Sequence, residues 1–156
     1  MKRIVSYMLF FTFLSIAAFA KYGFGPTGQT PVVTNTKEFV ITVISSRMRK
    51  LLPNRQGEAS DRCRYLLLEV KVENKTSKAH FISSGYFVAI VNAQTCEDES
   101  SVFWRTKCGL QTIKLQPGTH TIGFLCFEIP YAPKKIIIKY TDPSPSVIIK
   151  IPSLKN

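Results

Sequence analysis

One stretch of the sequence reads Arg64-Tyr65-Leu66-Leu67-Leu68-Glu69-Val70-Lys71-Val72-Glu73-Asn74. Every second residue of it is apolar, at Leu66, Leu68, Val70 and Val72. The alternate positions begin with Leu67 and then become charged, at Glu69, Lys71 and Glu73. Because successive side chains of a β-strand point to opposite faces, the stretch is predicted to be a strand with one face on a hydrophobic core and the other toward water.

The same two-residue period recurs outward from this stretch. Strands are predicted at Phe39–Ile44, Phe81–Val91, Thr121–Ile129, Lys134–Tyr140 and Val147–Ile151. Turn-forming residues separate them, most clearly Gln116-Pro117-Gly118-Thr119. Only Ile44–Leu52 offers a rival helix, and it is too short to change the fold class. The sequence therefore predicts an all-β antiparallel sandwich.

The predicted strands also indicate which faces meet. In Thr121–Ile129, the residues Leu125, Phe127 and Ile129 share one face, and we expect them to share a core with Leu66, Leu68, Val70 and Val72. Ser83-Ser84-Gly85 interrupts the predicted strand Phe81–Val91, where a bulge or a kink suits the glycine.

The first twenty residues resemble an export signal. Lys2 and Arg3 precede the apolar run Ile4–Phe19, and the small residues Ala18 and Ala20 stand at the positions that a signal peptidase reads. The alternative is a retained membrane anchor, for which the run is short. We expect residues 1–20 to be a cleaved signal peptide and the protein to be periplasmic or secreted, with only peripheral membrane contact.

The rest of the chain is divided by composition. Residues 21–36 are rich in Gly, Pro and Thr and are predicted to be a flexible lead-in. Residues 37–156 are predicted to form the one folded domain.

Four cysteines follow the predicted signal: Cys63, Cys96, Cys108 and Cys126. An even number of cysteines in an exported chain favours disulfide bonds, whereas a zinc site calls for closer pairs. Antiparallel pairing would set the start of one strand beside the end of the other, with Cys63 and Cys126 pointing away from the core. We therefore predict Cys63–Cys126 and Cys96–Cys108, and Cys63–Cys108 with Cys96–Cys126 remains the alternative.

Two stretches carry a resemblance to a known family. The strand Arg64–Asn74 ends in a Val-x-Val-x-Asn pattern, and Leu115-Gln116-Pro117-Gly118 leads into Gly123–Pro130. Over about residues 38–141 the chain resembles the telokin-like family of small exported bacterial domains, typified by a mycobacterial secreted immunoprotective antigen. The resemblance implies an antiparallel immunoglobulin-like β-sandwich of about seven to nine strands. It implies no catalytic residues, and the family pattern does not require the four cysteines.

No residue pattern indicates an enzyme. His80 and His120 are far apart in the sequence, and the acidic run Glu97-Asp98-Glu99 lacks the alternating spacing of a calcium loop. We predict no catalytic residues, no cofactor and no metal site. A small-ligand carrier, or a hydrolase whose site is built from loops, remains the alternative.

Charge gives the one clue to a partner. The chain has 21 Lys and Arg residues against 10 Asp and Glu residues, a formal net charge of +11. Six basic residues fall close together: Arg47, Arg49, Lys50, Arg55, Arg62 and Arg64. We predict that this segment contacts an acidic protein or an envelope polyanion. Nucleic acid is not expected, because the segment lacks interleaved aromatic residues, and a merely solubilising loop stays open.

Overall fold

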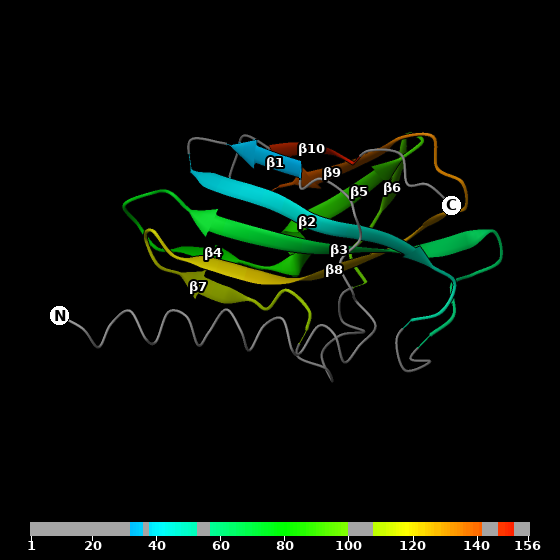
Figure 1. Cartoon of the computed structure of the whole chain (residues 1–156), viewed down its shortest axis with the longest axis horizontal. Helices are drawn as coiled ribbons and strands as arrows, with labels where there is room; N and C mark the ends of the chain where they lie inside the picture. The colour runs from blue at the N-terminus through cyan, green and yellow to red at the C-terminus, as the bar shows by residue number, and fades with distance from the viewer. Residues whose placement is uncertain (1–31, 36–37, 53–56, 100–107, 142–146, 152–156) are drawn as a thin grey trace.

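Figure 1 shows the chain as a computed structural model, which describes residues 32–35, 38–52, 57–99, 108–141 and 147–151. Its strands are β1 (Val32–Asn35), β2 (Phe39–Arg49), β3 (Cys63–Asn74), β4 (His80–Ile82), β5 (Phe87–Val91), β6 (Gln94–Cys96), β7 (Ile113–Leu115), β8 (His120–Pro130), β9 (Ile136–Tyr140) and β10 (Val147–Ile151). A 3-10 turn, η2 (Ser84–Tyr86), precedes β5. Within these ranges, no helix is both long and apolar enough to cross a membrane.

The strands form two four-stranded antiparallel sheets and a small ribbon. The first sheet has the order β1-β2-β3-β8, the second has the order β10-β9-β5-β6, and β4 pairs with β7. The all-β antiparallel sandwich is therefore confirmed (Figure 1). The described residues form ten strands rather than seven to nine. β4, β6 and β7 have three residues each, too few for an alternating pattern to reveal them.

The predicted core is also confirmed. β3 and β8 pair antiparallel with Leu66 opposite Phe127 and Leu68 opposite Leu125. All seven residues named from the alternating pattern are buried in one cluster, which we call the main core: Leu66, Leu68, Val70, Val72, Leu125, Phe127 and Ile129. The inward side chains of the second sheet complete it from the other side, among them Phe87, Ala89, Ile138 and Tyr140.

The structure corrects three boundaries. The folded domain begins inside the segment predicted as a lead-in, because the β-branched Val32 and Val33 pair with β2 as strand β1. The predicted strand Phe81–Val91 is two strands in different sheets, since η2 turns the chain between β4 and β5. β2 continues to Arg49 through a bulge between Val43 and Ser45, so the rival helix is a strand. Residues 1–31, with the predicted signal peptide, lie outside the described residues.

The outer edge of β8 is paired with two short segments. Glu99 N–H donates to the Cys126 carbonyl at 2.6 Å, and Leu110 N–H donates to the Phe124 carbonyl at 2.9 Å. The Phe124 N–H in turn donates to the Cys108 carbonyl at 2.9 Å. These bonds satisfy backbone groups that an open edge strand would expose.

Gly123 is required by this edge. A Cβ built on Gly123 would lie 2.5 Å from Leu110 Cα and 2.7 Å from Leu110 N. Both are backbone atoms, so no side chain can rotate away, and only glycine lets the Leu110 backbone cross here. Leu110 itself is buried in the main core.

Candidate functional site

A hairpin covers the outward face of the first sheet. We call its two described arms, residues 50–52 and 57–59, the cover hairpin. Its ends are joined where Leu52 N–H donates to the Gly57 carbonyl and Ala59 N–H donates to the Lys50 carbonyl, both at 2.9 Å. Leu52 and Ala59 are buried against outward-facing residues of β3 and β8. Together they form a second hydrophobic cluster, the outer cluster: Leu52, Ala59, Tyr65, Leu67, Phe124 and Cys126.

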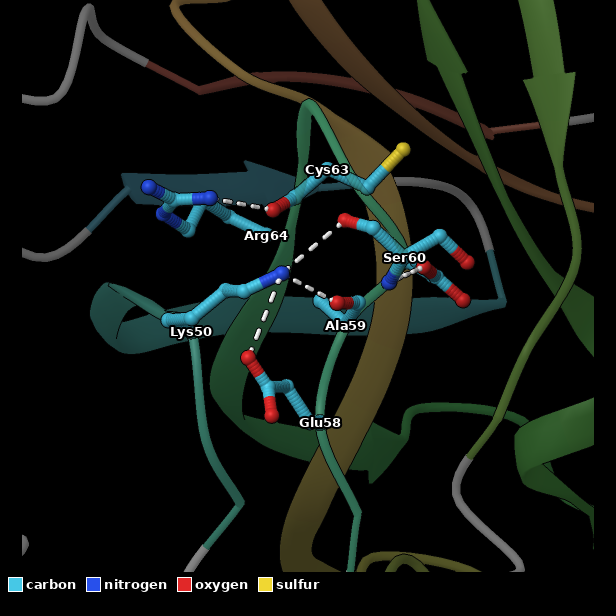
Figure 2. Close-up of polar contacts among 7 residues, drawn as sticks. Lys50, Glu58, Ala59, Ser60, Cys63 and Arg64 are labelled. Carbon is cyan, nitrogen blue, oxygen red and sulfur yellow. Dashed lines mark hydrogen bonds and ion pairs between the residues drawn. The ribbon is translucent and has the colours of Figure 1, made fainter.

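Lys50 holds the cover hairpin in place. Its ammonium group donates to the carbonyls of Ala59 and Ser60 and lies 3.5 Å from a carboxylate oxygen of Glu58 (Figure 2). The Ser60 N–H donates to the Glu128 carboxylate on β8, which fastens the end of the hairpin to the sheet. Lys50 was predicted to contact an anionic partner; its ammonium group contacts carbonyls of its own chain and Glu58, while 32% of its side chain stays exposed.

Arg47 and Arg49 lie on the outward face of β2. Arg47 is opposite Leu67 and Arg49 is opposite Tyr65 on β3. Burial and the neighbouring Arg49 lower the pKa of Arg47, and Glu69 acts in the opposite direction. Arg47 is thus partly committed to its own sheet, whereas Arg49 is exposed.

Glu69 is the carboxylate beside Arg47. It accepts a hydrogen bond from the Ser45 hydroxyl at 3.1 Å. Burial raises the pKa of Glu69, while Ser45 and Arg47 act to lower it. The group is a polar, half-buried contact between β2 and β3 rather than an exposed acid.

Arg64 points to the other side of β3. It is opposite Ile129, whose side chain is in the main core. Its guanidinium carbon lies 4.6 Å from the ring centroid of Tyr131, and its Nη1 donates to the Cys63 carbonyl at 2.6 Å. Arg62 precedes it in a left-handed turn with φ 62° and is exposed. The predicted basic residues therefore lie on different sides of the sheet.

A different group of cations gathers at one end of the sandwich. Tyr131 N–H donates to the Arg62 carbonyl at 2.7 Å, which joins the turn before β3 to the turn after β8. Lys134 N–H donates to the Asn92 side chain at 3.1 Å, and Asn92 N–H donates to the Lys135 carbonyl at 3.3 Å. The bond from Tyr131 links the turn at Arg62 to the segment that follows β8, and we call the four cations on these two segments the basic end: Arg62, Arg64, Lys134 and Lys135.

The basic end includes two of the six residues predicted from the sequence and adds two. Lys134 and Lys135 were missed because they are about seventy positions from Arg62 in a separate stretch of sequence. A usable signal was present, since antiparallel pairing of the strand Thr121–Ile129 with the strand at Arg64 sets the following turn beside Arg62. Arg55, the remaining predicted contact, lies outside the described residues.

No disulfide bond joins any two of the four cysteines in the structure, so neither predicted bond is present. Cys63 and Cys126 both point away from the main core, as predicted, and both contact the outer cluster. However, Cys126 is opposite Leu67 and Cys63 is opposite Pro130. At about 3.3 Å per residue, the four-residue offset is about 13 Å, beyond the range of about 4.4–6.8 Å between the Cα atoms of a disulfide.

The other two cysteines contact different clusters. Cys96 packs against the main core, and Cys108 packs against the outer cluster. Burial raises the pKa of the Cys126 thiol, and the carboxylates of Asp98 and Glu99 add to that effect. Burial likewise raises the pKa of Cys96. Both thiols are thereby held in the protonated, less reactive form.

The two histidines and the acidic run lie in different parts of the fold. His80 lies edge-on to Phe39, with ring centroids 5.4 Å apart, and His120 is exposed at the start of β8. Asp98 forms a single antiparallel bridge with Phe127 at the edge of β8. Within the described part of the chain, no three His, Cys, Asp or Glu residues are grouped so that they could hold a metal ion.

Solved structures share this fold. A putative lipoprotein from Bacillus subtilis matches with a TM-score of 0.65 and 15% identity, over 80% of this chain and 39% of that one. A functionally unknown protein from Listeria monocytogenes matches with a TM-score of 0.57 and 12% identity, over 82% of this chain and 87% of that one. A conserved hypothetical protein from Bacillus anthracis matches with a TM-score of 0.55 and 14% identity, over 79% of this chain and 96% of that one. This chain spans well under half of the first of these proteins.

The sequence comparisons point the same way. No curated protein matches this chain significantly. A family model, described as a domain of unknown function (DUF4352), matches residues 29–147. That range begins just before β1 and ends at the first residue of β10, so it contains almost the whole sandwich. The chain belongs to the DUF4352 family.

Proposed function

We propose that this protein is a non-enzymatic interaction module that works outside the cytoplasm and binds an anionic partner through the basic end. The observation that carries the proposal is the hydrogen bond from Tyr131 to Arg62, which joins the turn that carries Arg62 to the segment that carries Lys134 and Lys135. The signal-like N-terminus and the telokin-like resemblance support export. The Bacillus subtilis protein of similar fold is described as a putative lipoprotein, which fits the same location.

The chemistry of the basic end suits carboxylate or phosphate groups. Arg62, Lys134 and Lys135 are exposed, and in the described residues no ion pair engages them. Arg64 is oriented by Tyr131 below its guanidinium group. A guanidinium that is held in place loses less conformational freedom when its planar donors meet an anion. The exposed Asp61 lies in the same turn as Arg62 and reduces the local positive charge. The site therefore favours multivalent anions, which can compete with this one carboxylate for the cations.

The test uses inorganic polyphosphate as a soluble anionic probe. The variant Lys134→Ser/Lys135→Ser removes two cations of the basic end, and Lys78→Ser/Lys114→Ser removes two exposed cations elsewhere. We expect the first variant to bind about fivefold to tenfold more weakly and the second to bind as the wild type does, because exposed ion pairs contribute about 0.2–1 kcal/mol each. Binding should weaken further as salt rises, since charges are screened over about 8–10 Å.

The set predicted from the sequence supplies the second comparison. Arg47→Ser/Arg49→Ser should weaken binding less than Lys134→Ser/Lys135→Ser, because Arg47 is partly engaged by its own sheet. Equal losses in all three variants would show that only net charge matters. Such a result, or binding that does not respond to salt, would overturn the assignment to the basic end.

A further inference from the structure

The outward face of the second sheet carries an alternating pattern of isoleucine, valine and lysine. In one row Ile148 on β10 is opposite Lys139 on β9, which is opposite Val88 on β5. In the next row Lys150 is opposite Ile137, which is opposite Ile90. We call these six residues the lysine–isoleucine face: Val88, Ile90, Ile137, Lys139, Ile148 and Lys150.

The apolar members of this face are not part of a core. Among the described residues, none of the four belongs to the main core or to the outer cluster, or packs against either. Ile148 is 56% exposed, which is among the highest values for a large hydrophobic residue in the described chain. Val88, Ile90 and Ile137 are partly exposed beside it. The face thus leaves apolar surface in contact with water.

The charge on this face has one sign. The four strands of the second sheet, β5, β6, β9 and β10, contain lysine but no aspartate or glutamate. On the first sheet, by contrast, Lys71 lies 3.6 Å from the carboxylate of Glu73. Lys139 and Lys150 have no such neighbour within their own sheet.

We propose that the lysine–isoleucine face docks onto an anionic phospholipid surface. Such a surface offers an anionic headgroup layer directly above an apolar layer, and this order matches the two kinds of side chain on the face. Isoleucine and valine can enter the boundary between headgroups and acyl chains, while lysine stems lie along the apolar surface and keep their ammonium groups at the headgroups. The inference goes beyond the basic end, since it uses none of the same residues.

Sedimentation with lipid vesicles tests the proposal on the exported protein. The vesicles contain phosphatidylcholine with phosphatidylglycerol, and pure phosphatidylcholine vesicles are the neutral reference. We expect binding to the anionic vesicles only, falling as salt rises. The variant Lys139→Gln/Lys150→Gln should bind roughly 25-fold more weakly at low salt, at about fivefold for each lysine near the surface.

Two matched controls separate the face from general properties of the chain. Lys78→Gln/Lys114→Gln removes the same charge from other exposed positions and should bind like the wild type. Ile148→Ser should weaken binding, whereas Val33→Ser, at a residue with 55% exposure on β1, should not. Each variant is first shown to unfold at the same urea concentration as the wild type.

The possible outcomes are distinct. Equal binding to neutral vesicles, or equal losses in both lysine pairs, would overturn the docking face. Capture of an acidic soluble protein through Lys139 and Lys150, without vesicle binding, would identify a protein surface and refute the lipid assignment. The polyphosphate experiment on Lys134 and Lys135 is independent, because those variants leave the lysine–isoleucine face intact.

Discussion

The two outward faces of the sandwich are built from strands with similar alternation but end in different states. On the first sheet, the cover hairpin buries Leu67 and Phe124 to 2% and 1% exposure. On the second sheet, Ile137 and Ile148 occupy corresponding outward positions and stay in contact with water. An apolar residue on an outward face is therefore part of a core only if another segment returns to cover it.

The charged side chains also differ between the outward faces of the two sheets. Several outward charges of the first sheet have partners: Glu73 lies near both Lys71 and Lys75, and Glu69 lies beside Arg47. The second sheet presents lysines alone. The cover hairpin therefore adds buried apolar contacts on the first sheet, whereas the outward face of the second sheet keeps apolar and cationic side chains exposed.

Truncating a side chain under the cover should have the largest effect. Phe124→Ala should lower the free energy of unfolding by about 3–5 kcal/mol, as expected for Phe127→Ala in the main core, because both rings are fully buried. Ile137→Ala on the bare face should cost about 1 kcal/mol. Urea unfolding of the three variants measures this, and a loss below 1 kcal/mol for Phe124→Ala would show that the cover adds no core.

Gly123→Ala should have the next largest effect. The added methyl group meets the Leu110 backbone, so the segment crossing β8 must shift, at a cost of about 1–3 kcal/mol. Gly85→Ala is the matched control, since its Cβ would meet only Ser83 Oγ at 3.9 Å. Similar stability of both variants in urea would contradict the close approach.

Removing the Lys50 contact should let the cover hairpin open more often without unfolding the protein. Lys50→Met should change the free energy of unfolding by less than about 1 kcal/mol, since the ion pair with Glu58 is exposed. It should nevertheless speed alkylation of Cys126, whose thiol is protected by burial and by a raised pKa. Mass spectrometry under reducing conditions follows the rate, with Lys114→Met as the control; an unchanged rate would mean that Lys50 does not hold the hairpin.

The smallest effect is expected on the bare face. Ile148→Ser should change the free energy of unfolding by no more than about 0.5 kcal/mol, because the side chain is mostly exposed. The urea midpoint checks this against Val33→Ser. A loss of several kcal/mol would show that a further segment covers the second sheet.

Local patterns in the sequence determined a large part of the fold. The alternation from Arg64 to Asn74 placed a central strand and its core face correctly, and the same rule placed Leu125, Phe127 and Ile129. The turn at Gln116–Thr119 was also visible, and Gly118 adopts the left-handed φ of 68° that glycine accommodates. These features depend on side-chain direction within a strand or on one residue's backbone, so neighbouring residues reveal them.

Tertiary structure alone decided what covers each face and which distant residues meet. The outward direction of Cys63 and Cys126 was predictable, but the strand register that separates them was not. The sequence likewise grouped Lys50 with Arg62 as one basic segment, yet Lys50 contacts the cover hairpin, and the Arg62 carbonyl accepts a backbone hydrogen bond from Tyr131 in the segment that leads to Lys134 and Lys135. Register and cover arise from contacts between segments far apart in the chain, and a periodic pattern contains no information about which segment returns to which face.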